Sequence, residues 1–277
     1  MKNKSSLAQK LCASPHIVWS AIFIVVPLVM VLYYAFTDSS GAFTFDNILR
    51  LGDYTTTFLC SIWYGIIATI ICLLIAYPLA YIIAQSKARV QSTMIMLVMV
   101  PMWMNFLLRT YSWMTLLEDN GVINSLLDKI GVGPFHMINT SGAVILGMVY
   151  NFLPYMILPI YSVMTKLDKS LVEAAQDLGA NKVRVLKDVI FPSTLSGVVS
   201  GITMVFVPSV STFYISQKLG GGSFALIGDI IEMQFQISNN FNFGAALSLV
   251  LMILILICMA IMNKFGDDEN AAGGMMI

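Results

Sequence analysis

Long apolar runs, separated by short polar stretches, dominate the chain. Six of these runs approach the roughly 20 residues that a helix needs to cross the hydrocarbon core of a bilayer. The pattern therefore predicts six transmembrane helices with short connecting segments. The predicted spans are Ile17–Phe36, Ile62–Ala84, Met94–Thr115, Ala143–Met164, Leu195–Ile215 and Phe243–Met262.

Composition agrees with this pattern. Of the 277 residues, 58% are hydrophobic and only 11% are charged, whereas about 25% of a soluble domain is charged. The formal net charge is zero, so the sequence offers no basic surface for nucleic acid. We therefore expect a single all-α integral membrane domain over residues 1–277, embedded in the lipid bilayer.

Basic residues divide unevenly among the segments that join the spans. With the N-terminus placed inside, eleven Lys and Arg residues fall on the inner side and three on the outer side. Positive residues concentrate in the cytoplasmic loops of membrane proteins, so both termini are predicted to be cytoplasmic. The first apolar run is longer than a signal-peptide core and is predicted to be retained. The inner residues are Lys2, Lys4, Lys10, Lys87, Arg89, Lys166, Lys169, Lys182, Arg184, Lys187 and Lys264, and the outer ones are Arg50, Lys129 and Lys218.

The longest predicted cytoplasmic segment, residues 165–194, has the pattern of two short amphipathic helices. Ser170 and Glu173 are spaced as a capping box at the start of the first helix. Gly179 is placed to end that helix in a left-handed conformation, and Asn181 is placed to cap the second. The predicted apolar faces are Leu171, Ala174, Ala175 and Leu178 in the first helix, and Val183, Leu186 and Ile190 in the second.

This segment resembles the EAA loop of ABC-importer permeases. The matching residues are Glu173-Ala174-Ala175, Gly179 and Val189-Ile190-Phe191-Pro192. The family pattern has the same spacing, and Val189 and Phe191 replace an isoleucine and a leucine. The resemblance implies that the segment couples the permease to an ATPase subunit through Glu173, Ala174, Ala175, Gly179 and Pro192. For Glu173, a local capping role and a docking role are compatible.

Further stretches are similar to spermidine/putrescine permeases over most of the chain. The resemblance implies a type I (MetI-like) importer transmembrane domain with core helices over residues 60–263. It also implies an ATP-binding ABC subunit, a second homologous permease and an extracellular polyamine-binding protein as partners. The matching stretches include Met102-Trp103, Arg109-Thr110-Tyr111, Leu117-Glu118, Asn120-Gly121, Leu153-Pro154-Tyr155-Met156, Pro159-Ile160-Tyr161, Leu167-Asp168-Lys169, Phe213-Tyr214, Leu219-Gly220-Gly221 and Leu226-Ile227-Gly228.

The chain has no recognisable catalytic motif. Gly220-Gly221-Gly222-Ser223 lacks the lysine with which a P-loop reaches the phosphates of ATP. We therefore expect no cofactor in this chain, with ATP and Mg²⁺ bound by the partner ATPase. Isolated His16 and His136 are expected to do no chemistry.

A polyamine is a flexible polycation, so its recognition requires carboxylates and aromatic faces. Asp229 and Glu232 would share a helix face, either as a first contact for the cation or as an ordinary solvated face. The candidate substrate path comprises Asp229, Glu232, Glu118 and Asp119 with the aromatic residues Trp103 and Tyr150.

Arg109 is the one charge well inside a predicted span. It is expected either to extend towards the interface, to pair with Glu118 or Asp119, or to contact the substrate-delivering protein. For the whole chain, the alternatives to polyamine import are the same architecture for iron, thiosulfate or an opine, and a membrane enzyme or scaffold.

Overall fold

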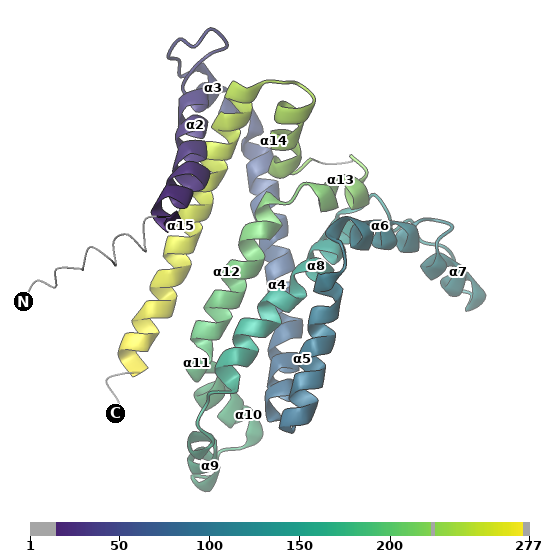
Figure 1. The fold of residues 1–277 in the computed structure, drawn as a ribbon. Coiled ribbons are helices and arrows are strands. Elements are labelled where there is room, and N and C mark those ends of the chain that lie inside the picture. Colours follow the sequence, from purple (N-terminus) through teal and green to yellow (C-terminus); the bar gives the residue numbers. More distant parts are fainter. Residues whose placement is uncertain (1–14, 223–224, 274–277) are drawn as a thin grey trace, which may run out of the picture. The chain divides into compact units, whose positions relative to one another are not determined.

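The computed structural model describes residues 15–222 and 225–273, and every named element in these ranges is a helix (Figure 1). The basic residues Lys2, Lys4 and Lys10 of the topology prediction lie outside the described residues. The backbone divides into two compact units, Met1–Thr55 with Ile230–Ile253 and Thr56–Asp229 with Leu254–Ile277. The single-domain organisation stays a prediction.

The α-helices differ widely in length, and short π and 3₁₀ turns extend some of them. The π turns are η1 (Ala21–Val25) and η3 (Leu186–Ile190), and the 3₁₀ turn is η2 (Arg50–Tyr54). The α-helices are α2 (Val26–Ala35), α3 (Asp46–Leu49), α4 (Thr55–Gln85), α5 (Ala88–Trp103), α6 (Phe106–Leu117), α7 (Val122–Lys129), α8 (Ser141–Met164), α9 (Lys169–Asp177), α10 (Lys182–Val185), α11 (Phe191–Ser193), α12 (Leu195–Ser211), α13 (Tyr214–Gly220), α14 (Ile227–Gln236) and α15 (Phe241–Gly273).

The first unit packs the N-terminal helix against the beginning of the last one. The Asn242 side chain in α15 donates a hydrogen bond to the carbonyl oxygen of Thr37 at 2.7 Å. The Arg50 guanidinium lies 4.7 Å from the centre of the Phe243 ring. Small side chains let the helices come close, and the buried residues of this core are Ala35, Ala245, Ala246 and Leu249.

The second unit has a core formed largely by α4, α8 and α12. Two glycines in α12 face α8 at close range. A Cβ at Gly197 would lie 2.9 Å from the Pro159 carbonyl oxygen, and one at Gly201 would lie 2.7 Å from Met156 Sδ. Small residues at helix contacts allow the close backbone approach on which packing in a membrane depends.

Within the described residues, four helical segments are long and apolar enough to cross a membrane, and six spans result if each of two bent pairs counts as one. The predicted number of spans therefore agrees with the structure under that count. The four are Pro15–Ala35, Asp46–Gln85, Ser141–Met164 and Phe241–Met262.

The third span was predicted to be continuous over Met94–Thr115, and this is wrong. The helical segments Ala88–Trp103 and Phe106–Lys129 meet at an angle of 89°. Pro101 lacks an amide proton, which weakens the end of α5. The Asn105 side chain then accepts a hydrogen bond from the Leu107 amide at 2.8 Å and starts α6 as a new helix.

The fifth span is also shorter than predicted, because α12 ends at Ser211. A bend of 67° separates Lys182–Ser193 from Leu195–Ser211. At the bend, the Thr194 hydroxyl donates to the Ile190 carbonyl oxygen at 2.8 Å. The chain thus turns sharply where the predicted coupling segment joins the membrane helix.

Candidate functional site

The predicted coupling segment, residues 165–194, folds into two helical parts joined by a glycine turn. The first part is α9, and its C-cap residue is Leu178. Gly179 follows with φ of +83°, and a Cβ there would meet nothing within 4 Å. The Asn181 side chain then accepts from the Arg184 amide at 2.9 Å and caps α10. The predicted left-handed glycine and the predicted Asn181 cap are both confirmed.

The predicted cap of α9 is wrong. Asp168, two residues before Ser170, is the N-cap residue, and its carboxylate accepts a hydrogen bond from the Ser170 amide at 2.9 Å. This backbone hydrogen bond lowers the pKa of Asp168 below its ordinary value of 3.8. The Ser170 and Glu173 capping box is therefore replaced by a carboxylate cap, which leaves Glu173 exposed within the helix.

The two sides of α9 have different surroundings. Val172 and Ala175 are partly buried and pack against the core of the second unit. Leu171 is 50% exposed, Leu178 is 90% exposed, and Ala174 is also exposed. The predicted apolar face thus splits, since Ala175 turns inwards while the other three residues form an apolar surface open to a partner. We call Leu171, Ala174 and Leu178 the α9 face.

The second half of the segment departs from a regular helix. After α10, the backbone widens into the π turn η3 before α11 begins at Phe191. The extra residue per turn rotates the side chains, so Val185 and Ile190 are buried whereas Val183 is 73% exposed. The predicted shared face of Val183, Leu186 and Ile190 is therefore wrong. Pro192 lies exposed within α11, next to the bend at Thr194.

Asp229, the first candidate of the substrate path, is a buried carboxylate in α14. Its side chain is held by the Ser216 hydroxyl at 2.8 Å and by the Leu226 amide at 2.7 Å. The residue is 8% exposed. The Leu226 hydrogen bond closes the turn that starts α14, and the Ser216 bond joins that turn to α13. Asp229 therefore stabilises the connection between α13 and α14.

The remaining candidates lie on several different elements. Glu232 is partly exposed, three residues after Asp229 in α14. Trp103 is 73% exposed at the end of α5. Tyr150 in α8 packs against Trp113, with ring centres 5.3 Å apart. The structure thus gives Tyr150 a packing partner and leaves the Trp103 ring open.

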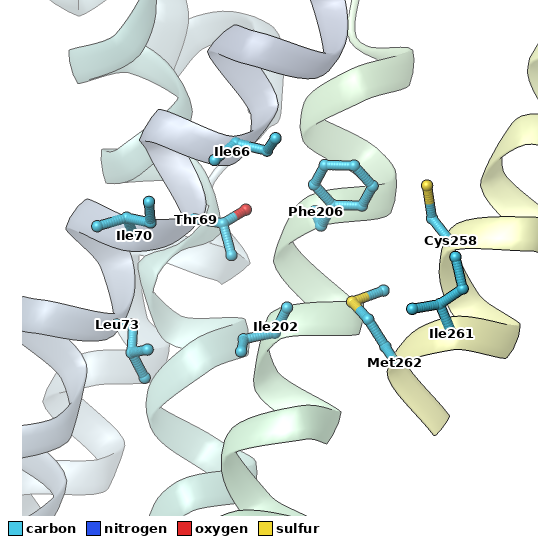
Figure 2. Close-up of a pocket in the computed structure, with 9 residues that line it drawn as sticks. All are labelled: Ile66, Thr69, Ile70, Leu73, Ile202, Phe206, Cys258, Ile261 and Met262. Carbon is cyan, nitrogen blue, oxygen red and sulfur yellow. The ribbon is translucent and has the colours of Figure 1, made fainter. Parts of the chain in front are cut away.

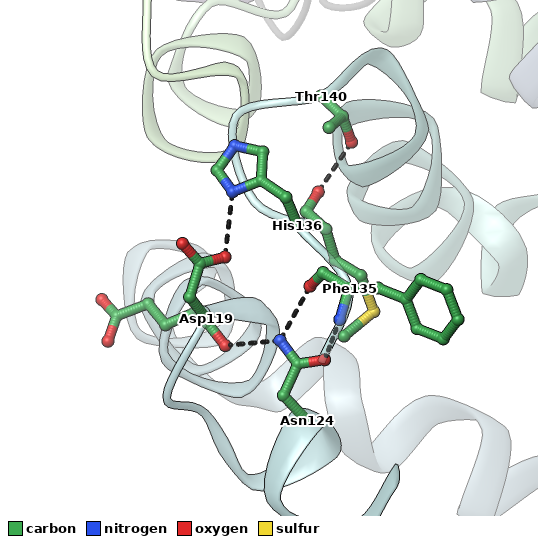
Figure 3. A network of polar contacts seen from close by, with 7 residues as sticks. Asp119, Asn124, Phe135, His136 and Thr140 are labelled. Carbon is green, nitrogen blue, oxygen red and sulfur yellow. Dashed lines mark hydrogen bonds and ion pairs between the residues drawn. The ribbon is translucent and has the colours of Figure 1, made fainter. Parts of the chain in front are cut away.

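Glu118 and Asp119 are exposed at the end of α6, beside a polar network (Figure 3). Asp119 Oδ1 lies 2.9 Å from His136 Nδ1. Buried Asn124 donates to the Phe135 carbonyl oxygen and accepts from the Phe135 amide, both at 2.8 Å. Asn124 therefore holds this loop on α7, and His136, which was predicted to be isolated, contacts the turn between α6 and α7.

Arg109 lies in α6, after the break in the third span. Its side chain is 8% exposed, and its Nε and Nη1 atoms have no hydrogen-bond partner. No ion pair joins it to Glu118 or Asp119 within the described residues. Its guanidinium carbon lies 6.0 Å from the centre of the Phe106 ring. The predicted ion pair is therefore wrong, whereas the extension towards the interface and the contact with the substrate-delivering protein stay predictions.

A cavity of about 310 Å³ lies between α4, α12 and the end of α15 (Figure 2). Its walls are apolar apart from Thr69, whose hydroxyl donates to the Gly65 carbonyl oxygen at 2.7 Å within α4. A carboxylate that could hold a polyamine is absent from its lining. Among the described residues, there is also no group of three or more potential metal ligands.

Sequence reasoning missed two polar contacts beside the coupling segment. The Tyr161 hydroxyl donates to Gln91 Oε1 at 3.3 Å, and the Tyr77 hydroxyl lies 3.0 Å from Thr194 Oγ1. Each joins residues that are at least 70 positions apart in the sequence. Helical periodicity has no signal for such pairs, although buried hydroxyl and amide groups usually find partners.

Comparison with known proteins gives consistent matches. The family model described as "Binding-protein-dependent transport system inner membrane component" matches residues 13–267. The chain is 36% identical to the spermidine/putrescine transport system permease protein PotB of Haemophilus influenzae, over 87% of this chain and 88% of that protein. It is 37% identical to the Escherichia coli K12 protein of the same name, over 78% and 82%.

Solved structures agree on the fold. A bacterial ABC transporter involved in the import of the acidic polysaccharide alginate has a chain that matches with a TM-score of 0.74. The match covers 92% of this chain and 93% of that chain at 16% identity. At this identity the likeness supports the arrangement of the helices and carries no information on the solute.

Proposed function

This chain belongs to the family of binding-protein-dependent transport system inner membrane components, and we propose that it is the permease subunit of an ATP-driven importer of spermidine and putrescine. It is a multi-pass membrane permease with an importer fold. The proposed solute follows from the relatives, which are named as spermidine/putrescine permeases. The chain matches them over most of their length.

One observation supports the proposed coupling role: the α9 face is apolar and open, although the neighbouring side of α9 is packed against the core. Leu178 alone is 90% exposed. Burying a leucine side chain contributes about 2 kcal/mol. A partner that covers this face would therefore gain binding free energy from the burial of Leu178. We propose that an ATP-binding subunit, which holds ATP and Mg²⁺, docks here, with Glu173 exposed at the edge of the contact.

The remaining partners follow from the same family. A second homologous permease would complete the pathway, and an extracellular polyamine-binding protein would deliver the solute. This arrangement requires the segment 165–194 and both termini to be cytoplasmic. It also requires only weak recognition within the pathway, since the binding protein supplies most of the specificity.

For the pathway itself, the structure separates the candidates by environment. Glu118 and Trp103 are exposed and Glu232 is partly exposed, so a passing cation can reach all three, and Asp119 lies in contact with His136. The Asp229 carboxylate accepts hydrogen bonds from the Ser216 hydroxyl and the Leu226 amide. We propose that Glu232, Glu118 and Trp103 contact the polyamine, and that Asp229, Asp119 and Tyr150 support the path by holding its walls.

The docking proposal is tested by co-purification. The tagged chain is expressed with the other importer subunits, and the amount of ATPase that purifies with it is measured for wild type and for Leu178→Asp. The substitution places a charge in the proposed contact, so the ATPase should be lost at least tenfold. The control is Ile130→Asp, which changes an aliphatic residue that is 70% exposed at the end of α7.

Ile130→Asp should retain the ATPase, because α7 lies on the predicted opposite side of the membrane. Equal recovery of the ATPase with wild type and Leu178→Asp would contradict docking at the α9 face. An absence of any ATPase with the wild-type chain would contradict the importer proposal itself.

A further inference from the structure

The helical hairpin formed by α4 and α5 is joined to the last turn of α8, just before the coupling segment, and to Thr194 at the end of that segment. At the start, Tyr161 near the end of α8 donates its hydroxyl to Gln91 Oε1 in α5 at 3.3 Å. At the finish, Tyr77 in α4 lies 3.0 Å from Thr194 Oγ1. We call the Tyr161–Gln91 contact the entry tie and the Tyr77–Thr194 contact the exit tie.

The entry tie ends on a side chain that is itself fixed. Gln91 Nε2 donates to the carbonyl oxygens of Ala84 at 2.9 Å and Ser86 at 2.8 Å. These carbonyls lie at the C-terminal end of α4, where helical partners are lacking. Gln91 therefore locks the first turn of α5 to the end of α4, and Tyr161 is attached to the hairpin as a whole.

The exit tie lies at the bend between the coupling segment and α12. Thr194 is fully buried, and its single hydroxyl proton is directed to the Ile190 carbonyl oxygen at 2.8 Å. The donor in the tie is therefore Tyr77. The Tyr77 ring also packs against Phe191, with ring centres 5.6 Å apart. A movement of the bend is thus passed directly to α4.

Beside the entry tie, a cavity separates parts of the hairpin from parts of the coupling segment. A cavity of about 190 Å³ is lined by Gln85 and Gln91 from the hairpin, by Thr165 after α8, and by Val172 from α9. The coupling segment and the hairpin are therefore not in continuous contact at this point. The two ties add polar contacts to the apolar packing of Val172 and Ala175 against the core.

We propose that the two ties carry the movement of the docked coupling segment into α4 and α5. In this role, Tyr77, Gln91, Tyr161 and Thr194 are positioning residues for energy coupling. The inference rests on the proposed docking of an ATPase at the α9 face. The ties provide a route by which docking moves α4 and α5, two membrane helices that are not adjacent to the coupling segment in the sequence.

The test uses the complete importer in proteoliposomes with its binding protein. ATP hydrolysis is measured with and without solute-loaded binding protein, and uptake of labelled spermidine is measured in parallel. The variants are Tyr77→Phe, Tyr161→Phe and the double variant, each of which removes only a hydroxyl oxygen. Tyr81→Phe is the matched control, one turn further along α4 and also partly buried.

Loss of one neutral hydrogen bond typically changes an equilibrium by about fivefold. We expect the double variant to lose at least fivefold of the stimulation of ATP hydrolysis by the loaded binding protein, and uptake per ATP should fall with it. Recovery of the ATPase with the tagged chain should stay at the wild-type level. Tyr81→Phe should retain both stimulation and uptake.

Wild-type stimulation and wild-type uptake per ATP in the double variant, with the ATPase bound, would overturn the role of the ties. A double variant that loses expression and ATPase binding together would also overturn it, because the hydroxyls would then serve the fold alone. Absence of ATPase from the wild-type preparation would instead refute the proposed function on which the inference rests.

Discussion

Substitutions at Gly179, in the glycine turn of the coupling segment, distinguish the effect of backbone conformation from the effect of side-chain size. The two effects predict different orders of transport activity among the variants. Gly179 has φ of +83°, and nothing lies within 4 Å of the position that its Cβ would occupy. A substituted residue therefore meets no steric obstacle within this chain. Its cost comes from the left-handed backbone, which disfavours residues with a Cβ by about 1–2 kcal/mol.

The order of effects follows from that cost. Gly179→Ala should destabilise the turn by about 1 kcal/mol, which lowers the equilibrium constant for forming the docking conformation about fivefold. Gly179→Asn should be milder although its side chain is larger, because asparagine tolerates the left-handed region. Gly179→Val should be the most severe, since a β-branched residue is least compatible with positive φ.

The assay is uptake of labelled spermidine at several concentrations in cells that express the importer, with membrane content of the chain measured by immunoblotting. The expected order of uptake is Gly, Asn, Ala and Val. Uptake that instead falls with side-chain volume, with Asn below Ala, would refute the conformational argument. That result would place a partner surface directly against residue 179.

Three further predictions concern the helix cap and the acidic residues. Asp168→Ala should destabilise α9 more than Asp168→Asn does, because asparagine retains a capping oxygen; protease sensitivity of the segment measures the difference, and equal sensitivity of the two variants would contradict the cap. The pKa of Asp168 is lowered by the Ser170 amide, so its contribution should be complete above its ordinary value of 3.8 and disappear only as pH falls below that value. Ser216→Ala should lower the free energy of unfolding by about 2 kcal/mol, because it removes a donor to the buried Asp229 carboxylate; an unchanged thermal midpoint in detergent would show that this hydrogen bond adds nothing. Glu232→Gln should reduce spermidine uptake severalfold without changing that midpoint, and wild-type uptake across all concentrations would remove Glu232 from the path.

Much of the membrane architecture can be predicted from periodicity and charge. The apolar runs identify the long helices because lipid imposes a minimum length on any span. The break near Met104 could not be predicted in the same way. Pro101 is visible in the sequence, but Pro154 and Pro159 lie within α8, which continues through both of them. Whether a proline breaks a span depends on which neighbouring groups satisfy the freed carbonyls.

The coupling segment shows a similar division between local and tertiary information. Gly179 and Asn181 act through their own backbone neighbours, so short sequence patterns identify their roles correctly. The predicted cap of α9 is wrong because aspartate and serine have nearly equal preferences for the N-cap position, so the sequence does not distinguish Asp168 from Ser170. The π turn after α10 also escaped prediction, since it changes the periodicity on which the assignment of faces depends.

The polar candidates of the path were the hardest to interpret from the sequence. Asp229 and Glu232 share a helix and a charge, yet Asp229 is 8% exposed and bonded to Ser216. Burial of that kind arises from the packing of α13 and α14, which residue spacing does not encode. Arg109 shows the same limit, because its enclosure follows from the break before α6.

The central claim, that this chain is a polyamine permease driven by a docked ATPase, is tested most directly by reconstituted transport. The importer is assembled in proteoliposomes with the wild-type chain or with Leu178→Asp, and uptake of labelled spermidine and putrescine is measured with and without ATP. The account predicts ATP-dependent uptake of at least one of the two polyamines with the wild-type chain and none with Leu178→Asp. Uptake that proceeds equally without ATP, or an assembled wild-type importer that moves neither polyamine, would contradict it.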